Sequence, residues 1–226
     1  MKIALILYGQ PRFITNGIVK EYYKKIFDTY NVDVYGHLWW SKDETVYDVS
    51  TWSKMNECSV SPNTPDIMNE LYPNNKIIYE SSRDFNIPEK LTNRFAYRSE
   101  VFNVKNLKNV ISHLYSFEKS VSQVPNDYDF YIISRTDSII YDFPNLYTLD
   151  NDKFYISNHH DNFPDLIFVF GKKYLNFMKT YSNFESNINS VWEPSAESVK
   201  SETFKKYYNM SELNKITMTV EVTRIF

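Results

Sequence analysis

Residues 128–138 read YDFYIISRTDS, an apolar run that ends abruptly in charged and hydroxyl side chains. The run from Phe130 to Ile133 predicts a short strand buried on both faces. Arg135 and Asp137 then lie where this strand leaves its sheet, and ligands of open α/β sheets bind at the carboxyl ends of strands. A carboxylate there can hold a divalent cation, and an arginine suits phosphate. A surface turn closed by an Arg–Asp pair fits the same spacing, so this stretch alone leaves both interpretations open.

Strands and helices are expected to alternate along the rest of the chain. Strands are predicted at Ile3–Tyr8, Val32–Trp39, Lys76–Tyr79, Phe154–Ile156, Leu166–Phe170 and Ile216–Thr223. Helices are predicted at Thr15–Thr29, from Thr64 to before Pro73, and at Ser99–Val121, Tyr174–Tyr181 and Ser195–Tyr208, with Thr64 and Ser195 as caps. Residues 41–65, 83–93 and 183–194 are predicted to be irregular links. The β-α-β opening favours a single α/β domain over residues 1–226, an α/β/α sandwich with a mostly parallel central sheet.

The composition argues against several classes of protein. The 226 residues carry a net charge of −3, whereas a nucleic-acid binder usually has a basic surface. Cys58 is the only cysteine, so the chain cannot form an internal disulfide, and a packing role in a reducing compartment is favoured. No targeting segment is visible, and no run approaches the roughly 20 apolar residues that span a bilayer. We therefore expect a soluble, cytoplasmic protein without membrane insertion.

A second candidate site follows the first predicted strand, at Gly9-Gln10-Pro11-Arg12. In a parallel sheet this turn leaves from the same edge as Arg135 and Asp137. Backbone amides of such a turn, with Arg12 beside them, could hold a base and phosphates. The turn is neither a P-loop nor a G-x-G-x-x-G loop, because the required glycines and lysine are missing.

The densest group of titratable residues lies before the predicted strand at Leu166–Phe170, and comprises His159, His160, Asp161 and Asp165. Two adjacent histidines on a strand point to opposite faces and are poor joint ligands for one metal, although a loop relaxes this limit. The functional interpretation gives one histidine to a metal or substrate and makes Asp165 the acceptor of a proton from a hydroxyl. The structural alternative is a solvated turn.

Other polar and aromatic residues have a structural explanation beside a functional one. His37, at a strand end, can face a ligand or lie satisfied in the core. The helix dipole already explains acids near a helix start, namely Glu193, Glu197 and Glu202. The arginines Arg94, Arg98 and Arg224 could bind phosphate, or they could simply be solvated. The tryptophans Trp39, Trp40 and Trp52 could stack on a sugar, or they could bury the 41–65 loop against the rest of the protein. Two acids upstream of their strand should lie far from Asp137, namely Asp127 and Asp129.

Four motifs in this order resemble one family. They read LYGQPRF at 7–13, VDVYGHLW at 32–39, YDFYIISRTD at 128–137 and PDLIFVFG at 164–171. Together they resemble the small GT-A-type glycosyltransferases of large DNA viruses and of bacterial surface-polysaccharide clusters, over residues 1–208. In size and opening motif the chain is also similar to the amino-terminal domain of a chlorella-virus glycosyltransferase that modifies the major capsid protein.

The resemblance implies a nucleotide-sugar donor and a Mn²⁺ or Mg²⁺ cofactor. It makes Arg135-Thr136-Asp137 the counterpart of the family's Asp-x-Asp metal motif, with Asp137 the retained carboxylate. The first aspartate is Arg135 here, which puts bidentate metal binding in doubt and offers a guanidinium to phosphate or ribose. The turn residues Tyr8, Gly9, Gln10 and Arg12 would take the base and ribose, with Arg98 a further donor contact. Asp165 falls at the family's acceptor-side aspartate, whereas Glu197 matches only loosely.

The resulting prediction is a metal-assisted glycosyltransferase with Asp165 as general base. It would move a sugar, with glucose and rhamnose considered, from UDP to a hydroxyl of a glycan or glycoprotein. A viral capsid protein is one acceptor considered, and a viral enzyme would work in the host cytoplasm. Two alternatives stay open, a metal-dependent nucleotide hydrolase or phosphotransferase and a non-catalytic carbohydrate-binding module. The sequence leaves open the donor sugar, linkage, stereochemistry, oligomeric state and any part taken by His159, His160 or Glu197.

Overall fold

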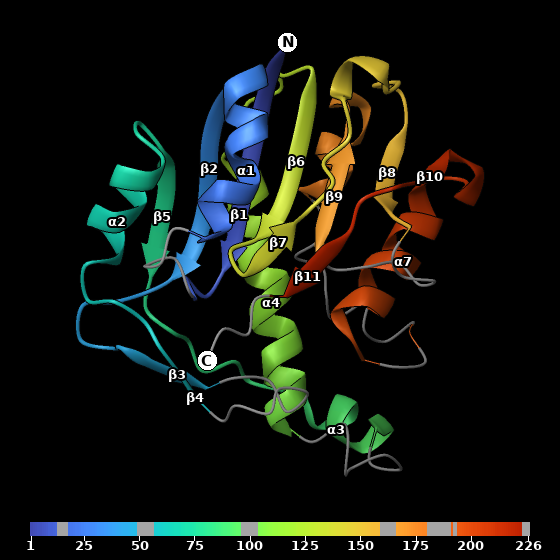
Figure 1. Ribbon diagram of the computed structural model, residues 1–226. Helices are drawn as coiled ribbons and strands as arrows, with labels where there is room; N and C mark the ends of the chain where they lie inside the picture. Colours follow the sequence, from blue (N-terminus) through green and yellow to red (C-terminus); the bar gives the residue numbers. More distant parts are fainter. Residues whose placement is uncertain are drawn as a thin grey trace.

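The computed structural model describes residues 1–12, 18–48, 57–95, 104–158, 166–179, 191 and 194–222. Its centre is a seven-stranded sheet with the order β10-β8-β9-β6-β1-β2-β5 (Figure 1). The strands are β1 (Lys2–Gly9), β2 (Asn31–Trp39), β5 (Lys76–Glu80), β6 (Phe130–Arg135), β8 (Phe154–Ser157), β9 (Ile167–Phe170) and β10 (Leu213–Ile216). All neighbours pair in parallel except β9, which is antiparallel to both β6 and β8. The predicted mostly parallel sheet is therefore confirmed.

The register of the three central strands brings their carboxyl ends to one edge. Tyr8 of β1 pairs with His37 of β2 on one side and with Arg135 of β6 on the other. Because these strands are parallel, the turns that follow them must emerge together. This edge of the sheet, at the ends of β1, β2 and β6, is called the carboxyl edge below.

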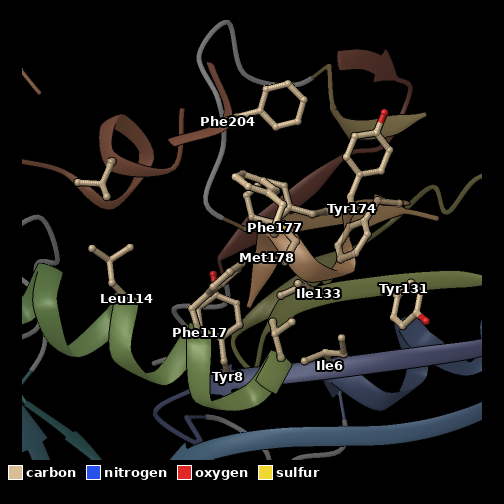
Figure 2. Close-up of a cluster of buried hydrophobic side chains, with 14 of the residues drawn as sticks. Ile6, Tyr8, Leu114, Phe117, Tyr131, Ile133, Tyr174, Phe177, Met178 and Phe204 are labelled. Atoms are coloured by element: carbon tan, nitrogen blue, oxygen red, sulfur yellow. The ribbon is translucent and has the colours of Figure 1, made fainter. Parts of the chain in front are cut away.

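One face of the sheet is covered by α4 (Val104–Ser122), α5 (Leu175–Met178) and α7 (Ala196–Tyr207), and α3 (Glu89–Phe95) adds Leu91 and Phe95 to the same hydrophobic cluster. Alternate residues of β1 point into this layer, namely Ala4, Ile6 and Tyr8. The buried stripe of α4 recurs at helical spacing and includes Leu107, Ile111, Leu114, Phe117 and Val121. Figure 2 shows Phe117 beside Tyr8, and their ring centroids are 5.2 Å apart.

The opposite face is covered by α1 (Ile18–Thr29), α2 (Thr64–Leu71) and a small sheet of β7 (Ser138–Ile140) and β11 (Val220–Val222). The intervening residues of β1 point here, namely Ile3, Leu5 and Leu7, and meet Tyr23 and Ile26 of α1. Helices on both faces of a mostly parallel sheet confirm the predicted α/β/α arrangement. The extent of the predicted single domain stays a prediction.

Several elements differ from the sequence prediction. The link predicted at 41–65 contains an antiparallel pair, β3 (Val46–Asp48) and β4 (Glu57–Ser59), and α3 overlaps the link predicted at 83–93. The single terminal strand predicted at 216–223 is divided, because β10 pairs with β8 in the central sheet whereas β11 pairs with β7. Short 3-10 turns occur at Leu146–Thr148, Lys172–Tyr174 and Met210–Glu212.

The two predicted helix caps have different outcomes. Ser195 precedes α7 and its hydroxyl accepts a hydrogen bond from Ser198 N–H at 3.1 Å, as predicted. Thr64 was expected to cap α2, but it is the first helical residue and Asn63 holds the cap position. The Thr64 hydroxyl instead donates to the Ser61 carbonyl at 2.7 Å, which ties the helix to the preceding turn. Among the described helices, none is long and apolar enough to cross a bilayer.

Candidate functional site

The turn after β1 is closed by contacts within itself and with α4. Gly9 has φ of +104°, a conformation that side chains with a Cβ rarely adopt. Its N–H donates to Ser116 Oγ of α4 at 3.0 Å. Arg12 N–H donates to the Gln10 carbonyl at 2.8 Å, and Arg12 Nε donates to the Gln10 side chain at 2.7 Å. The turn therefore presents Gln10 and Arg12 as one unit at the carboxyl edge.

A second group of charged residues follows β6. Arg135 binds Asp137 at two points, with Nε donating to Oδ1 at 2.9 Å and Nη2 donating to Oδ2 at 2.7 Å. Arg12 Nη1 lies 3.7 Å from the same Oδ2. Two guanidinium groups thus meet at one carboxylate, and Asp137 is only 4% exposed. We call Arg12, Arg135 and Asp137 the arginine pair and its carboxylate.

The structure joins the two predicted halves of the site through Thr136. Its N–H donates to the Tyr8 carbonyl at 3.3 Å, and its hydroxyl donates to the Gln10 carbonyl. The predicted proximity of Gln10 and Asp137 at one edge of the sheet is confirmed. Asp127 and Asp129, in contrast, receive hydrogen bonds from Lys2 at the start of β1, and so lie at the opposite edge as predicted. The predicted roles of these residues in donor binding stay predictions.

Beneath Tyr8 lies a buried polar group that the sequence analysis did not single out. Lys200 of α7 is fully buried, and its Nζ is 2.7 Å from His113 Nε2 and 3.2 Å from the Tyr8 hydroxyl. Burial and the positive charges of Lys200 and Arg135 hold the pKa of His113 well below its usual value. This lowered pKa favours the neutral imidazole, whose Nε2 can accept a hydrogen bond from Lys200 Nζ. Helical spacing of Lys200 with Ala196, Val199 and Phe204 was the available signal.

Tyr8 itself belongs to the core. Its ring is 1% exposed and packs edge-on against His113, with centroids 5.1 Å apart. The base or ribose contact predicted for Tyr8 is therefore not made by an exposed ring face, and stays a prediction for its backbone.

His37 is a satisfied core histidine. It is fully buried, with Nδ1 3.0 Å from Ser116 Oγ and Nε2 3.1 Å from Glu80 Oε2. Burial lowers the pKa of His37, and the nearby Glu80 only partly opposes this shift. Ser116 also donates to the His37 carbonyl, so one hydroxyl joins β2 to Gly9. Ser116 was missed because a serine within an apolar helix stripe carries no sequence signal for such a bridge.

The metal implied by the resemblance does not fit the described residues in this arrangement. Both oxygens of Asp137 accept hydrogen bonds from Arg135, and Arg12 adds a second positive charge beside Oδ2. A divalent cation would have to displace one guanidinium and lie against the other. Within the described ranges, no three His, Cys, Asp or Glu side chains gather as metal ligands. The Mn²⁺ or Mg²⁺ cofactor that the resemblance implies stays a prediction.

Several candidates lie outside the described residues, namely Trp52, Arg98, His159, His160, Asp161, Asp165, Glu193 and Arg224. Leu166 directly follows Asp165 in the sequence, and its carbonyl accepts from Arg135 N–H at 3.2 Å. Glu197 lies in the first turn of α7, which agrees with the helix-dipole explanation. Arg94 Nη2 donates to the Val191 carbonyl at 2.9 Å.

The tryptophans and the cysteine have packing roles where they are described. Trp39 is 3% exposed and stacks on Tyr115 with centroids 5.4 Å apart. Trp40 Nε1 donates to the Ser61 carbonyl at 3.0 Å, which holds the segment after β4. Burial raises the pKa of the Cys58 thiol, so this residue is not an activated nucleophile. These contacts match the packing explanation of the sequence analysis.

Comparison with known proteins gives limited similarity. No protein-family model matches the chain, and no curated protein matches it either. Solved structures that resemble it include the galactosyltransferase LgtC in complex with donor and acceptor sugar analogs, with a TM-score of 0.46 and 10% identity over 90% of this chain and 70% of that one. The glycosyltransferase GlyE of Streptococcus pneumoniae TIGR4 has a TM-score of 0.44 and 8% sequence identity, and the match covers 95% of this chain and 44% of GlyE. Likeness at this level carries no conclusion about activity.

Proposed function

We propose that the protein transfers a sugar from a nucleoside diphosphate, expected to be UDP, to an acceptor hydroxyl. One observation carries the proposal. The turn Gly9 to Arg12 and the cluster Arg135 to Asp137 meet at the carboxyl edge and are joined by hydrogen bonds from Thr136. These two segments also belong to the motifs on which the sequence resemblance depends. Ligand sites of open α/β sheets lie at this edge, which supports the assignment.

Within this proposal the two segments hold different parts of the donor. Backbone groups around Gly9 and Gln10 would contact the nucleoside, and the guanidinium groups of Arg12 and Arg135 would contact the diphosphate. When the acceptor oxygen bonds to the anomeric carbon, the bond from that carbon to the phosphate oxygen breaks. Its electron pair stays on the diphosphate, where the arginines stabilise the added negative charge.

The acceptor proton requires a base, and Asp165 is our candidate. This role rests on the sequence resemblance, supported by the contact of the adjacent Leu166 with Arg135. A base opposite the leaving group would suit direct displacement with inversion. The finer assignments also rest on resemblance, namely glucose or rhamnose as the sugar, Arg98 as a donor contact, and a glycan or glycoprotein such as a viral capsid protein as the acceptor.

The test is incubation of the protein with UDP-sugars and a panel of glycan acceptors, with and without Mn²⁺. Mass spectrometry of the glycans and measurement of released UDP give the readout. We expect a glycan mass increase of one sugar residue, with UDP released in equal amount. Phosphate release from varied nucleotides without sugar preference would indicate a hydrolase instead. Glycan binding that ignores UDP-sugars, without any turnover, would indicate a carbohydrate-binding module and contradict the proposal.

A further inference from the structure

We propose that Arg12 and Arg135 hold the donor diphosphate in place of a divalent cation, and that Asp137 positions these arginines rather than ligating a metal. This inference rests on the proposed function, because it concerns the diphosphate of the same donor. It departs from the Asp-x-Asp role that the resemblance implies for Asp137.

The geometry fixes one guanidinium firmly. Arg135 donates to both oxygens of Asp137, at 2.9 and 2.7 Å, and such a two-point contact defines the plane and direction of a guanidinium. The Asp137 side chain is 5% exposed and that of Arg135 is 22% exposed, so the contact between them is largely shielded from solvent. A guanidinium carries five N–H donors, which allows contact with a carboxylate and a phosphate at once. Asp137 is therefore placed to orient Arg135.

The charges at this point favour an anion. Arg12 Nη1 lies 3.7 Å from the same Oδ2 that Arg135 binds, and the Arg12 side chain is 17% exposed. Two guanidinium charges and one carboxylate give these three residues a combined charge of +1. A divalent cation beside Asp137 would be repelled by both arginines, whereas a diphosphate would be attracted by both. The arrangement thus has the electrostatic preference of a phosphate site.

Arg135 also lies near the buried His113 and Lys200. The charges of Arg135 and Lys200 add to burial in holding the pKa of His113 well below its usual value. The turn amides at the carboxyl edge lie beside the arginine pair and its carboxylate, because Thr136 bonds to the Gln10 carbonyl. A nucleotide held at the turn would have its phosphates within the reach of both arginines.

The two possible roles of Asp137 predict different behaviour of one variant. If Asp137 positions the arginines, Asp137→Asn keeps one acceptor for Arg135, and the affinity for UDP falls to the same extent with and without metal. If Asp137 ligates a metal, the same substitution removes only the part of the affinity that depends on Mn²⁺. Uridine provides the second comparison. It lacks the phosphates, so its binding should not depend on the arginines.

The experiment is calorimetric titration of metal-depleted protein with UDP and with uridine, in EDTA and again in MnCl₂. We expect the affinities for UDP in the two buffers to agree within about twofold. The corresponding difference in binding free energy is less than that of one hydrogen bond. Arg12→Gln and Arg135→Gln should each lower the affinity for UDP about tenfold in both buffers, because each removes one charge-assisted contact. Their uridine affinity should not change. Lys76→Gln, which removes an exposed positive charge at the other end of the sheet, is the matched control and should bind UDP like the unmodified protein.

Three results would be decisive against the inference. UDP binding that needs Mn²⁺ and is unaffected by Arg135→Gln would assign the phosphates to a metal, while sugar transfer itself could stand. Loss of only the Mn²⁺-dependent affinity in Asp137→Asn would make that residue a metal ligand. Failure of UDP and all UDP-sugars to bind in either buffer would overturn this inference and the proposed function together. Thermal unfolding of each variant verifies its fold, and Arg135→Gln decides the question if Asp137→Asn does not fold.

Discussion

Gly9 holds a backbone conformation on which the turn after β1 depends. Its φ is +104°, and a Cβ built there would meet nothing within 4 Å. The cost of Gly9→Ala should therefore come from the backbone torsion alone, about 1–3 kcal/mol of the free energy of unfolding. Urea unfolding measures this loss, and UDP affinity should fall with it because the turn is displaced. An unchanged free energy of unfolding would show that another residue type fits the turn.

The arginine pair shows at residue scale what a motif can hide. The sequence identified Arg135 as a departure from a two-aspartate motif, but it could not show that this arginine binds Asp137 at two points or that Arg12 approaches the same oxygen. Side-chain contacts across two turns depend on the register of β1 with β6, which only the folded sheet determines. Lys200 and His113 were missed because their contact depends on the packing of α7 against α4, which the sequence does not show.

The helix α4 contacts the candidate site directly. Ser116 accepts a hydrogen bond from Gly9 N–H and donates to the His37 carbonyl, so α4 connects the ends of β1 and β2. Ser116→Ala should lower the free energy of unfolding by about 1–3 kcal/mol, because partly buried groups lose their partner. The control is Ser122→Ala on the same helix, whose exposed hydroxyl bonds only within α4 and whose loss should change stability by no more than about 0.5 kcal/mol. Equal effects of the two substitutions would contradict a bridging role for Ser116.

The long elements were predicted from the sequence, as were the four-residue strands β8 and β9, whereas several of the shortest elements were not. The strands β1, β2 and β6 contain continuous apolar runs and the helix α4 has a long apolar stripe at helical spacing, so their type and place follow from burial. The strands β3, β4 and β7 have three residues each and exist through their pairing, β3 with β4 and β7 with the distant β11. The helix α3 has seven residues, too few for a helical period to stand out from a polar link. The meeting of Gln10 and Asp137 was predictable because the carboxyl ends of parallel strands share an edge.

For the molecule as a whole, two buried histidines predict sensitivity to acid. Burial is the main cause that lowers the pKa of both His37 and His113 from the ordinary 6.5. Below that pH the unfolded chain takes up protons that the native state does not. The free energy of unfolding should therefore fall as pH falls from about 6.5 toward the native pKa values, by at most about 1.4 kcal/mol per pH unit for each histidine.

Urea unfolding at about pH 7.5, 6.5 and 5.5 measures this dependence. His113→Gln keeps an acceptor for Lys200 but cannot take up a proton, so its stability should fall less steeply with acidification than that of the unmodified protein. A free energy of unfolding that rises or stays constant between these pH values would contradict the lowered pKa of both histidines.

The central claim is that a nucleoside diphosphate binds at the carboxyl edge, between the turn after β1 and the end of β6. The most direct measurement is a UDP titration of the ¹⁵N-labelled protein followed by amide chemical shifts. We predict shifts concentrated at Gly9, Gln10, Arg12, Thr136 and Asp137, with little change at Lys2 and Asp129 on the opposite edge. Shifts confined to the opposite edge, or no shifts at saturating UDP, would contradict the account.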